Sequence, residues 1–334
     1  MKNNLTDKDI EVLNKWAEAY DIDELKIKDK EEIFNLEELY ISEEYIPTEV
    51  FKLTNLKKLY IDYYRNTELP REICNLINLE KLQLQIHDDE NDKIEYIPNE
   101  FFKLTNLEEL SIHYGISRKL PKEIGNLTNL KKLFIGGKDL MELPKEIGNL
   151  TNLKELFICC KSLRKLPEDI KNLINIKRLD ILCSYDLELT EEIGNIINLE
   201  TLYIACDNLK TIPSEIGKLI NLKELTIWTE VDGLIELPKE IGNLTNLKRF
   251  NIRCQNLKRL PKEIYNLINL EALEISCDNL ENFPDGIENL INLEILTLEI
   301  LTIRNPNETW NIKKLPMDGI GKLTKLKEFC ICRW

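Results

Sequence analysis

Histidine is scarce in this chain, since only His87 and His113 occur among its 334 residues. Neither belongs to a metalloprotease motif or to a Ser-His-Asp arrangement. Glycine is also sparse, with 12 residues, and the sequence contains no glycine-rich phosphate-binding loop. We therefore expect no catalytic residue, no metal site and no cofactor, and we interpret His113 as an ordinary surface residue.

The chain also lacks an excess of positive charge. It contains 45 Lys and Arg residues against 59 Asp and Glu residues, which gives a formal net charge of −14. A negative surface is repelled by nucleic-acid phosphates and by anionic lipid headgroups. This balance predicts neither a nucleic acid nor a membrane as partner.

Long apolar segments are missing as well. The longest apolar-looking stretch, residues 293–303, contains Glu294 and Glu299 and is too short to cross a bilayer. Residues 1–7 show no apolar signal region. Nine cysteines, an odd number spread along the chain, favour thiols in a reducing compartment. Together these features predict a cytoplasmic protein, unless a signal sequence has been removed.

The chain does contain a sequence motif that recurs with a period of 23 residues. Residues 143–158 and 237–252 both begin Leu-Pro-Lys-Glu-Ile-Gly-Asn-Leu-Thr-Asn-Leu-Lys. Such a period indicates one structural unit stacked many times, because each unit buries its apolar face only against its neighbours. Thirteen units start at the first position of a Leu-x-x-Leu-x-Ile pattern: Leu36, Leu56, Leu79, Leu107, Leu130, Leu153, Ile176, Leu199, Leu222, Leu247, Leu270, Leu293 and Leu326.

Each unit combines two periodicities. Positions 4 and 6, such as Leu156 and Ile158, alternate with polar or variable residues, which predicts a strand with one buried side. Residues 144–153 carry proline and then apolar residues every three positions, which predicts a short helical turn with proline in its first position. Thr190 replaces this proline in one unit, and we expect its side chain to cap the turn.

These motifs resemble the leucine-rich repeat family, in its 23-residue Leu-Pro-x-x-Ile-x-x-Leu-x-x-Leu class, which is common in bacterial proteins. The resemblance covers roughly residues 36–334. It implies an α/β fold, a right-handed leucine-rich repeat solenoid with a curved parallel sheet on the concave face and short helical or 3-10 segments on the convex face. We expect residues 1–35 to form an N-terminal helical cap with a capping strand, and residues 36–334 to form the 13-unit solenoid.

The N-terminal cap has its own sequence signals. Thr6 and Asp9 form a capping pair, and an apolar helical face runs from Ile10 to Tyr20. We predict a helix over residues 6–20, followed by an irregular strand near residues 22–27.

Cysteine departs from the usual family pattern, because it occupies position 8 of several strands. Position 8 has the parity of the buried positions 4 and 6, so these thiols should point inward as a reduced stack. Neighbouring strands lie about 4.8 Å apart, which exceeds the usual Cβ separation of a disulfide. Metal binding is the alternative, but neither a Cys-x-x-Cys pair nor a partnering histidine supports it. The cysteines are Cys160, Cys183, Cys206, Cys254 and Cys277.

Asparagine immediately precedes the first leucine in almost every unit, with Lys325 as the exception. We predict a structural role, in which the amide satisfies backbone groups where the turn enters the strand.

Insertions interrupt the period. Residues 88–92 form an acidic run, but Lys93 and Asn99 stand where a calcium loop needs glycine and glutamate, so we predict a solvated loop. Residues 302–314 should form a protruding loop or hairpin. The given chain stops directly after a strand pattern, and three readings of this edge stay open: Trp334 covers it, a second copy pairs with it by self-association, or the chain has been cut there.

Function is predicted on the concave face, where positions 3, 5 and 7 of each strand point outward. Aromatic residues inside a charged rim are typical of interaction sites. The alternative is that aromatic residues merely favour strands and pack across the sheet. The predicted partner-binding residues are Phe134, Phe157, Cys159, Leu182, Tyr203, Trp228 and Arg253, in one contiguous patch with Ala205, and the remaining rim residues are Lys132, Glu155, Arg178, Asp180, Glu224 and Arg249.

The sequence therefore predicts a non-enzymatic protein–protein interaction scaffold that binds another protein on its concave face. The alternative of a different class is a surface or secreted ligand-binding protein that recognises a host glycan or a matrix component.

Overall fold

The computed structural model describes residues 5–26, 29–43, 45–64, 70–86, 97–113, 119–230, 233–277, 279–281, 283–300 and 315–333. The chain divides into two compact units, Met1–Cys160 and Lys161–Trp334. Within the described ranges, thirteen strands alternate with short 3-10 segments. The predicted leucine-rich repeat solenoid is confirmed, while the predicted boundary at residue 35 stays a prediction.

The first unit contains strands β1 to β6, which follow one another side by side in sequence order and run parallel. The equivalent positions of the repeat pair with one another, for example Leu133 with Leu156 and Phe134 with Phe157. The strands are β1 Glu38–Ile41, β2 Lys58–Tyr64, β3 Lys81–Ile86, β4 Glu109–His113, β5 Lys132–Gly137 and β6 Glu155–Cys160.

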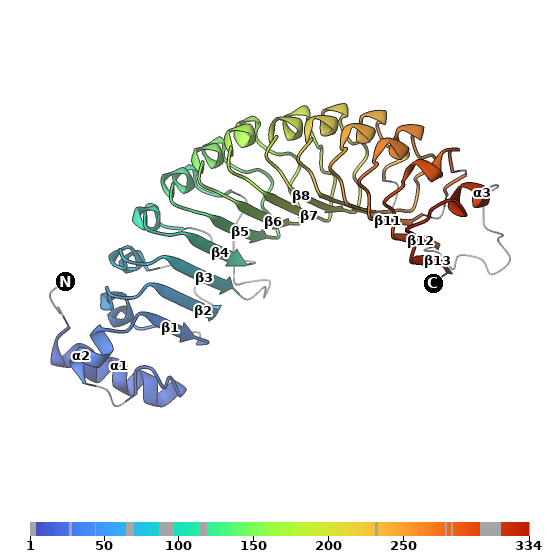
Figure 1. Cartoon of the computed structure of the whole chain (residues 1–334). Coiled ribbons are helices and arrows are strands. Elements are labelled where there is room, and N and C mark those ends of the chain that lie inside the picture. Colours follow the sequence, from blue (N-terminus) through green and yellow to red (C-terminus); the bar gives the residue numbers. More distant parts are fainter. Residues whose placement is uncertain are drawn as a thin grey trace. The chain divides into compact units, whose positions relative to one another are not determined.

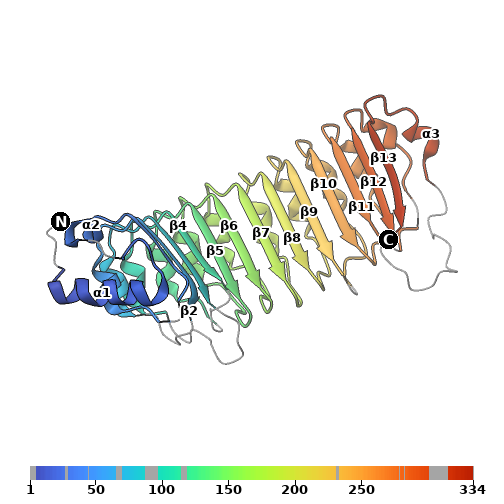
Figure 2. The same ribbon diagram turned by 90° about the horizontal axis from the view of Figure 1, so that it is seen from below.

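The second unit repeats this arrangement with strands β7 to β13, which are also parallel and in sequence order. Figure 2 shows the strands of each unit lying side by side. The strands are β7 Arg178–Cys183, β8 Thr201–Cys206, β9 Glu224–Thr229, β10 Arg249–Cys254, β11 Ala272–Ser276, β12 Ile295–Ile300 and β13 Glu328–Arg333.

The 3-10 segments lie on the opposite side of each unit from its strands (Figure 1). Their apolar residues recur every three positions, as the sequence predicts, but proline precedes the first helical residue instead of occupying it. The Pro144 carbonyl accepts the Ile147 amide at 3.0 Å. An N–H at this position would have no acceptor within the segment, so its absence in proline costs no hydrogen bond. The segments are Thr48–Lys52, Arg71–Asn75, Asn99–Lys103, Lys122–Asn126, Lys145–Asn149, Glu168–Asn172, Glu191–Asn195, Ser214–Lys218, Lys239–Asn243, Lys262–Asn266 and Ile287–Asn289.

The side-chain cap predicted for Thr190 is wrong. Thr190 precedes the segment Glu191–Asn195, but its side chain makes no capping hydrogen bond. Its hydroxyl donates instead to the Glu192 carboxylate, which lowers the pKa of that carboxyl. The acidic neighbour therefore takes the hydroxyl away from the backbone amides.

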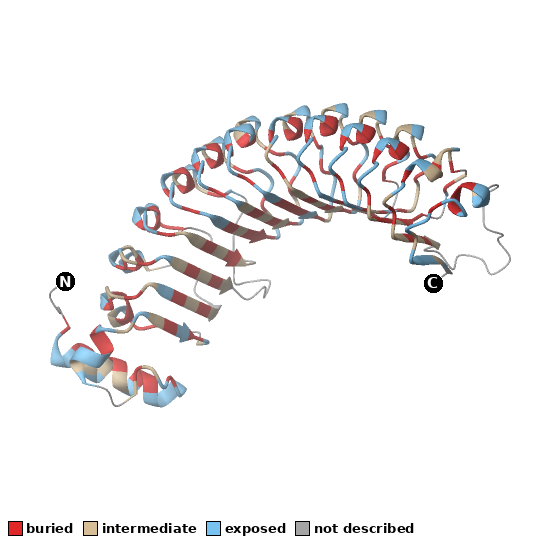
Figure 3. Cartoon of the chain, in the orientation of Figure 1, coloured by how far each residue is buried: buried red, intermediate tan, exposed pale blue. Residues whose placement is uncertain are grey.

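The core lies between the strands and the 3-10 segments. Positions 4, 6 and 8 of β6, occupied by Leu156, Ile158 and Cys160, are buried, whereas Phe157 and Cys159 between them are half-buried. Figure 3 shows the same alternation along the strands of each unit. The predicted strand register is therefore correct, and positions 3, 5 and 7 point away from the core.

Helix α1 (Asp7–Tyr20) covers the β1 end of the first unit, with helix α2 (Lys30–Phe34) beside it (Figure 2). The predicted capping pair is present, because Thr6 and Asp9 each accept the other's backbone amide. Trp16 Nε1 donates to the Tyr45 carbonyl at 3.1 Å. The N-terminal helix thus caps the core as predicted.

The irregular strand predicted near residues 22–27 is wrong. Residues 23–26 form a turn, and α2 follows it. The Asp29 side chain accepts the amides of Glu31 and Glu32, and the Glu32 side chain accepts the Asp29 amide. This capping box starts a helix that buries Ile33 and Phe34, which the sequence analysis did not predict.

The last strand leaves part of its core face open. Phe329 and Ile331 occupy positions 4 and 6 of β13, yet they are 38% and 44% exposed. Helix α3 (Met317–Ile320) precedes this strand and buries Ile320. The predicted acidic run 88–92, His87, the insertion 302–314 and Trp334 lie outside the described residues.

The position-8 cysteines point inward as predicted. Cys160, Cys183, Cys206, Cys254 and Cys277 are buried and are not in disulfides. Thr229 occupies the same buried position in β9. Cys330 is disulfide-bonded, however, so the expectation of thiols throughout is wrong at this residue. Cys330 occupies position 5 of β13, an outward position, so it is not part of the inward stack.

Burial should make two of these thiols unreactive. It raises the pKa of Cys160 and of Cys254 to about 12, because the apolar surroundings disfavour the thiolate. At pH 8 we expect iodoacetamide to label half-buried Cys74 well before Cys160 or Cys254, and to label all three in guanidinium chloride. Mass spectrometry of tryptic peptides measures this order. Equal rates for Cys74 and Cys160 in the folded protein would contradict the inward stack.

Glycine is required where two 3-10 segments approach closely. A Cβ on Gly217 would lie 2.6 Å from the Glu240 carbonyl oxygen of the next segment. We expect Gly217→Ala to lower the free energy of unfolding by about 1–3 kcal/mol, because the backbones must separate. A Cβ on Gly321 would meet nothing closer than 3.5 Å, so Gly321→Ala should be neutral or slightly stabilising. Urea denaturation followed by circular dichroism compares the two, and equal stability would refute the close approach.

Candidate functional site

The outward positions of the strands carry the predicted site residues, in two groups. Phe134, Phe157 and Cys159 lie on the sheet of the first unit, and Leu182, Tyr203, Trp228 and Arg253 lie on the sheet of the second. Each group occupies positions 5 and 7 of adjacent strands, as the sequence predicts. The continuity of the two groups as one patch stays a prediction.

A column of rings crosses the sheet of the first unit. The His113 and Phe134 rings stack with their centroids 4.1 Å apart, and Phe134 stacks on Phe157 at 6.4 Å. The Ser111 hydroxyl lies 2.8 Å from His113 Nε2. His113 is therefore part of the aromatic column rather than an isolated surface residue. Its position 7, diagonal to Phe134 on the next strand, was the sequence signal for this contact.

The column perturbs the ionisation of His113. Burial lowers the pKa of His113, and the nearby charge of Asp62 opposes this shift. One carboxylate oxygen of Asp62, Oδ1, is buried and has no hydrogen-bond partner among the described residues. The imidazole thus lies against an apolar ring on one side and under the influence of a carboxylate on the other.

A second aromatic pair lies on the same sheet, nearer to its first strand. Tyr40 and Tyr60 stack with centroids 4.3 Å apart and planes 3° from parallel. Lys81 Nζ lies 5.6 Å from the Tyr60 ring centroid and forms an ion pair with Glu109 at 2.8 Å. A hydrogen bond to Glu38 raises the pKa of Tyr40, since the phenolate would repel the carboxylate. Both tyrosines occupy position 5 of their units, but they were not among the predicted site residues.

The second unit presents an apolar row that ends in a cation. Position 7 of adjacent strands brings together Leu182, Ala205, Trp228 and Arg253 in this order. Leu182 is 37% exposed, and the guanidinium carbon of Arg253 lies 4.8 Å from the Trp228 ring centroid. This contact is a cation–π interaction, which holds the two long side chains against each other.

Position 5 of the same strands is more polar than predicted. Asp180 was expected in an exposed rim, yet it is only 6% exposed, because Arg178 covers it with hydrogen bonds of 2.8–3.1 Å. Burial and the negative charge of Asp180 raise the pKa of Tyr203 beside it. Arg178 and Asp180 therefore neutralise each other within the row.

Other rim residues also pair across strands. Lys132 contacts Glu155 at 3.2 Å on the first unit, and Arg249 lies 3.9 Å from Glu224 on the second. All four side chains are largely exposed, so each pair stabilises the fold by about 0–1 kcal/mol at most. Their main effect is to leave little unbalanced charge around the aromatic residues.

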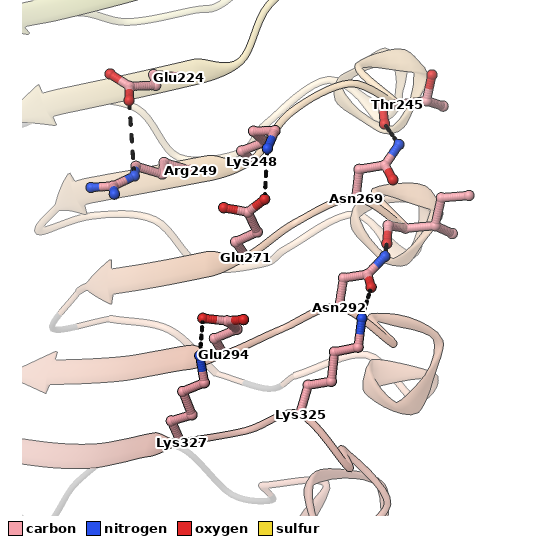
Figure 4. A network of polar contacts seen from close by, with 11 residues as sticks. Glu224, Thr245, Lys248, Arg249, Asn269, Glu271, Asn292, Glu294, Lys325 and Lys327 are labelled. Carbon is pink, nitrogen blue, oxygen red and sulfur yellow. Dashed lines mark hydrogen bonds and ion pairs between the residues drawn. The ribbon is translucent and has the colours of Figure 1, made fainter.

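A polar ladder follows the edge where each strand begins. The Nδ2 atoms of Asn198, Asn269 and Asn292 donate to the backbone carbonyls of Ile174, Thr245 and Ile268 in the preceding repeat, at 2.7–2.8 Å. Figure 4 shows part of this ladder, including Lys325, which replaces asparagine and donates to Asn292 Oδ1 at 2.6 Å. The predicted structural role of the asparagines is confirmed.

The ladder borders a shallow polar groove in each unit. The groove of the first unit has a volume of about 570 Å³ and that of the second about 420 Å³. Lysine and glutamate residues close one side, with Lys248 bound to Glu271 and Lys327 to Glu294, both at 2.7 Å (Figure 4). These charges satisfy one another in the second unit. The groove of the first unit is lined by Glu37, Glu80 and Glu108 with Lys57, which pairs with Glu37 at 2.8 Å.

Metal-binding clusters and membrane-spanning helices are both absent from the described part of the chain. No three His, Cys, Asp or Glu side chains come together there in a way that could hold a metal ion. No helix among the same residues is long and apolar enough to span a bilayer.

Comparisons with known proteins agree with this geometry. Residues 113–230 and 211–333 match a family described as a leucine-rich repeat region. A leucine-rich repeat protein of Leptospira interrogans is 34% identical with a TM-score of 0.69, over 87% of this chain and 71% of that one. A comparison with curated proteins found no match.

Two further structures share the fold at lower identity. The internalin InlF of Listeria monocytogenes is 18% identical with a TM-score of 0.58, over 97% of this chain and 93% of that one. The Arabidopsis receptor kinase HAESA, solved with the peptide hormone IDA and the co-receptor SERK1, is 20% identical with a TM-score of 0.58. That match covers 89% of this chain and 54% of HAESA.

Because His113 is half-buried, the free energy of unfolding should depend on pH. Because the folded protein binds this proton less tightly than the unfolded chain does, the neutral ring stabilises the fold above pH 6.5, and this contribution is lost as pH falls through the lowered pKa. A ¹H NMR titration should give His113 a pKa below 6.5. Phe134→Ala should move it back upward by exposing the ring, and Asp62→Asn should lower it further. An upward shift in Asp62→Asn would contradict the assigned causes.

Proposed function

Because the chain belongs to the leucine-rich repeat family, we propose that it is a non-enzymatic scaffold that binds another protein on the outward face of its sheets. The family fold is generally a protein-binding scaffold, and this proposal adds the residues. They are Phe134, Phe157 and Cys159 on the first unit and Leu182, Tyr203, Trp228 and Arg253 on the second.

One observation carries the proposal: large apolar side chains occupy positions that the core does not need. Positions 4, 6 and 8 already fill the interior of each unit with Leu, Ile and Cys. Leu182, Trp228 and Phe157 are outside this set and keep part of their surface in water. Apolar and aromatic residues gathered on an outward face favour association with a partner, because binding removes that surface from water.

Packing across strands explains only part of this pattern. The rings of Phe134 and Phe157 do stack, as aromatic residues on neighbouring strands commonly do. Leu182 has only Ala205 beside it in the next strand, however, and remains more than a third exposed. An exposed leucine next to an alanine gains little from the sheet, which favours the binding interpretation.

An enzymatic reading finds weak support in the Ser111–His113 contact. A hydrogen-bonded serine and histidine can act as nucleophile and base when a third group orients the base. Asp62 is the nearby candidate, but its buried Oδ1 accepts no hydrogen bond from the described residues. We therefore assign Ser111 the role of holding the His113 ring in the aromatic column.

Peptide recognition by a related fold is compatible with the proposal. HAESA was solved with a peptide hormone, although its likeness to this chain is one of fold alone.

The cytoplasm is the compartment that we propose for this chain. The buried thiols that are not in disulfides support it, whereas the disulfide at Cys330 does not.

A binding experiment tests the proposal directly. We expect Phe157→Asp combined with Trp228→Asp to abolish recovery of the proteins that the wild-type chain captures from its own cell extract, because each carboxylate would be desolvated against apolar partner groups. Quantitative mass spectrometry of the captured proteins measures the loss.

A matched control separates this site from general surface effects. Ile197 and Ile220 lie on the turns between the 3-10 segments and the strands and are both 55% exposed. Replacing both by aspartate makes the same chemical change away from the outward sheet face and should leave recovery intact. Circular dichroism confirms folding of all variants. Unchanged recovery with the Phe157 and Trp228 double variant removes the sheet face from consideration.

A further inference from the structure

The electrostatic surroundings of Arg253 differ from those of Arg178 and Arg249 on the same sheet. Arg178 is held by Asp180 at 2.8 Å, and Arg249 lies 3.9 Å from Glu224. Among the residues that the structure describes, no carboxylate forms an ion pair with Arg253, whose guanidinium contacts the Trp228 ring instead. In a chain with a net charge of −14, an exposed cation that forms no ion pair with the described residues is a specific feature of this surface.

The nearest acidic side chains on the following strands are engaged elsewhere. Asn251 donates to Glu274 at 2.8 Å, and Ser276 donates to Glu299 at 2.8 Å. Both carboxylates lie beyond Arg253, on β11 and β12, and they would repel an anion that approached from that side. An acidic group of a partner therefore reaches Arg253 most favourably from the side of Trp228 and β8.

The stack on Trp228 prepares Arg253 for a carboxylate. A guanidinium that lies on an aromatic face keeps its N–H groups at the rim of its plane, where a carboxylate accepts two parallel hydrogen bonds. The indole also restricts the long side chain before the partner arrives, so less conformational entropy is lost on binding.

An apolar partner group has a place in the same row. Ala205 is small and stands between Leu182 and Trp228 on the adjacent strands. A large apolar side chain of a partner can contact Leu182 and Trp228 across the smaller Ala205. Ala205 lies two strands from Arg253, which corresponds to about 10 Å at the usual strand spacing. A peptide in the polyproline II conformation rises about 3.1 Å per residue with three residues per turn, so two of its side chains three residues apart span this distance and point to the same side.

We propose that Leu182, Ala205, Trp228 and Arg253 bind a polyproline II segment of a protein partner, with one acidic and one large apolar side chain three residues apart. The acidic side chain pairs with Arg253 and the apolar one covers Ala205. The segment runs across the strands of the second unit. This inference rests on the proposed protein-binding function and adds the chemistry of the partner.

Peptide selection on the purified full chain provides the first test. A phage-displayed library of random twelve-residue peptides is selected on wild type, on Arg253→Gln and on Arg249→Gln. We expect peptides with Asp or Glu three positions from a large apolar residue to be enriched on wild type and on Arg249→Gln, but not on Arg253→Gln. Arg249 is the matched control, because it has the same charge and sheet but a carboxylate neighbour.

A double-mutant cycle provides the second test. The most enriched peptide and its variant with glutamine in place of the acid are titrated by fluorescence anisotropy. The acid-to-amide change should weaken binding to wild type about tenfold, as expected for a charge-assisted hydrogen bond, and binding to Arg253→Gln less than twofold. Arg253→Lys should retain only part of the coupling, because lysine lacks the planar fork.

The outcomes separate this inference from the proposed function. Peptides that bind the wild type through Leu182 and Trp228 without preferring an acid would overturn the inference and leave the protein-binding function standing. The same holds if Arg253→Gln selects the same acidic peptides as wild type. A selection that enriches no peptide on any of the three chains would count against both.

Discussion

Register between identical repeats is the constraint on which the rest of the structure depends. In each unit the parallel strands place equivalent positions of the repeat beside one another, as Leu202 beside Leu225 and Ile204 beside Ile227. The described exception is a register shift between Ile61 and Tyr64, where β2 pairs with β3. A slip of one residue would turn a whole column of leucines and isoleucines into water, so the buried face specifies the register strongly. Once it is specified, most side chains at positions 3, 5 and 7 lie outside the core and are available for other contacts.

Different contacts at the two corners of each repeat keep the distance between neighbouring repeats constant. Where a turn enters a strand, an asparagine amide reaches back to a carbonyl of the preceding repeat, with a contribution of about 0.5–1.5 kcal/mol per hydrogen bond. On the other side, glycine allows adjacent 3-10 segments to approach, as Gly217 does toward Glu240. Tyr265 fills the equivalent place near the end of the array and donates its hydroxyl to the Pro284 carbonyl. Small and large residues at this place thus serve the same spacing.

Much of the fold was predictable from the sequence because its signals are local and repeated. The alternation at Leu156 and Ile158, the inward Cys160 and the capping pair of Thr6 and Asp9 all depend on a few adjacent residues. The errors arose where a neighbouring polar group competed for a side chain. Thr190 donates to Glu192 instead of capping its turn, and residues 23–26 form a turn where a strand was expected, ahead of the Asp29–Glu32 capping box that starts α2. The disulfide at Cys330 falls at an outward position of β13, outside the inward cysteine stack.

The sequence by itself determined which residues face the core and which face outward, because a 23-residue period with alternating apolar positions admits only one register. It thereby named Phe157, Trp228 and Arg253 as outward residues before any contact was known. Only the tertiary structure decided which outward side chains meet: Arg178 covers Asp180 on its own strand, Arg253 lies on Trp228, and His113 lies on Phe134. The reason is physical. An inward side chain has one apolar space to fill. An outward side chain can adopt several rotamers and can contact several neighbours or water.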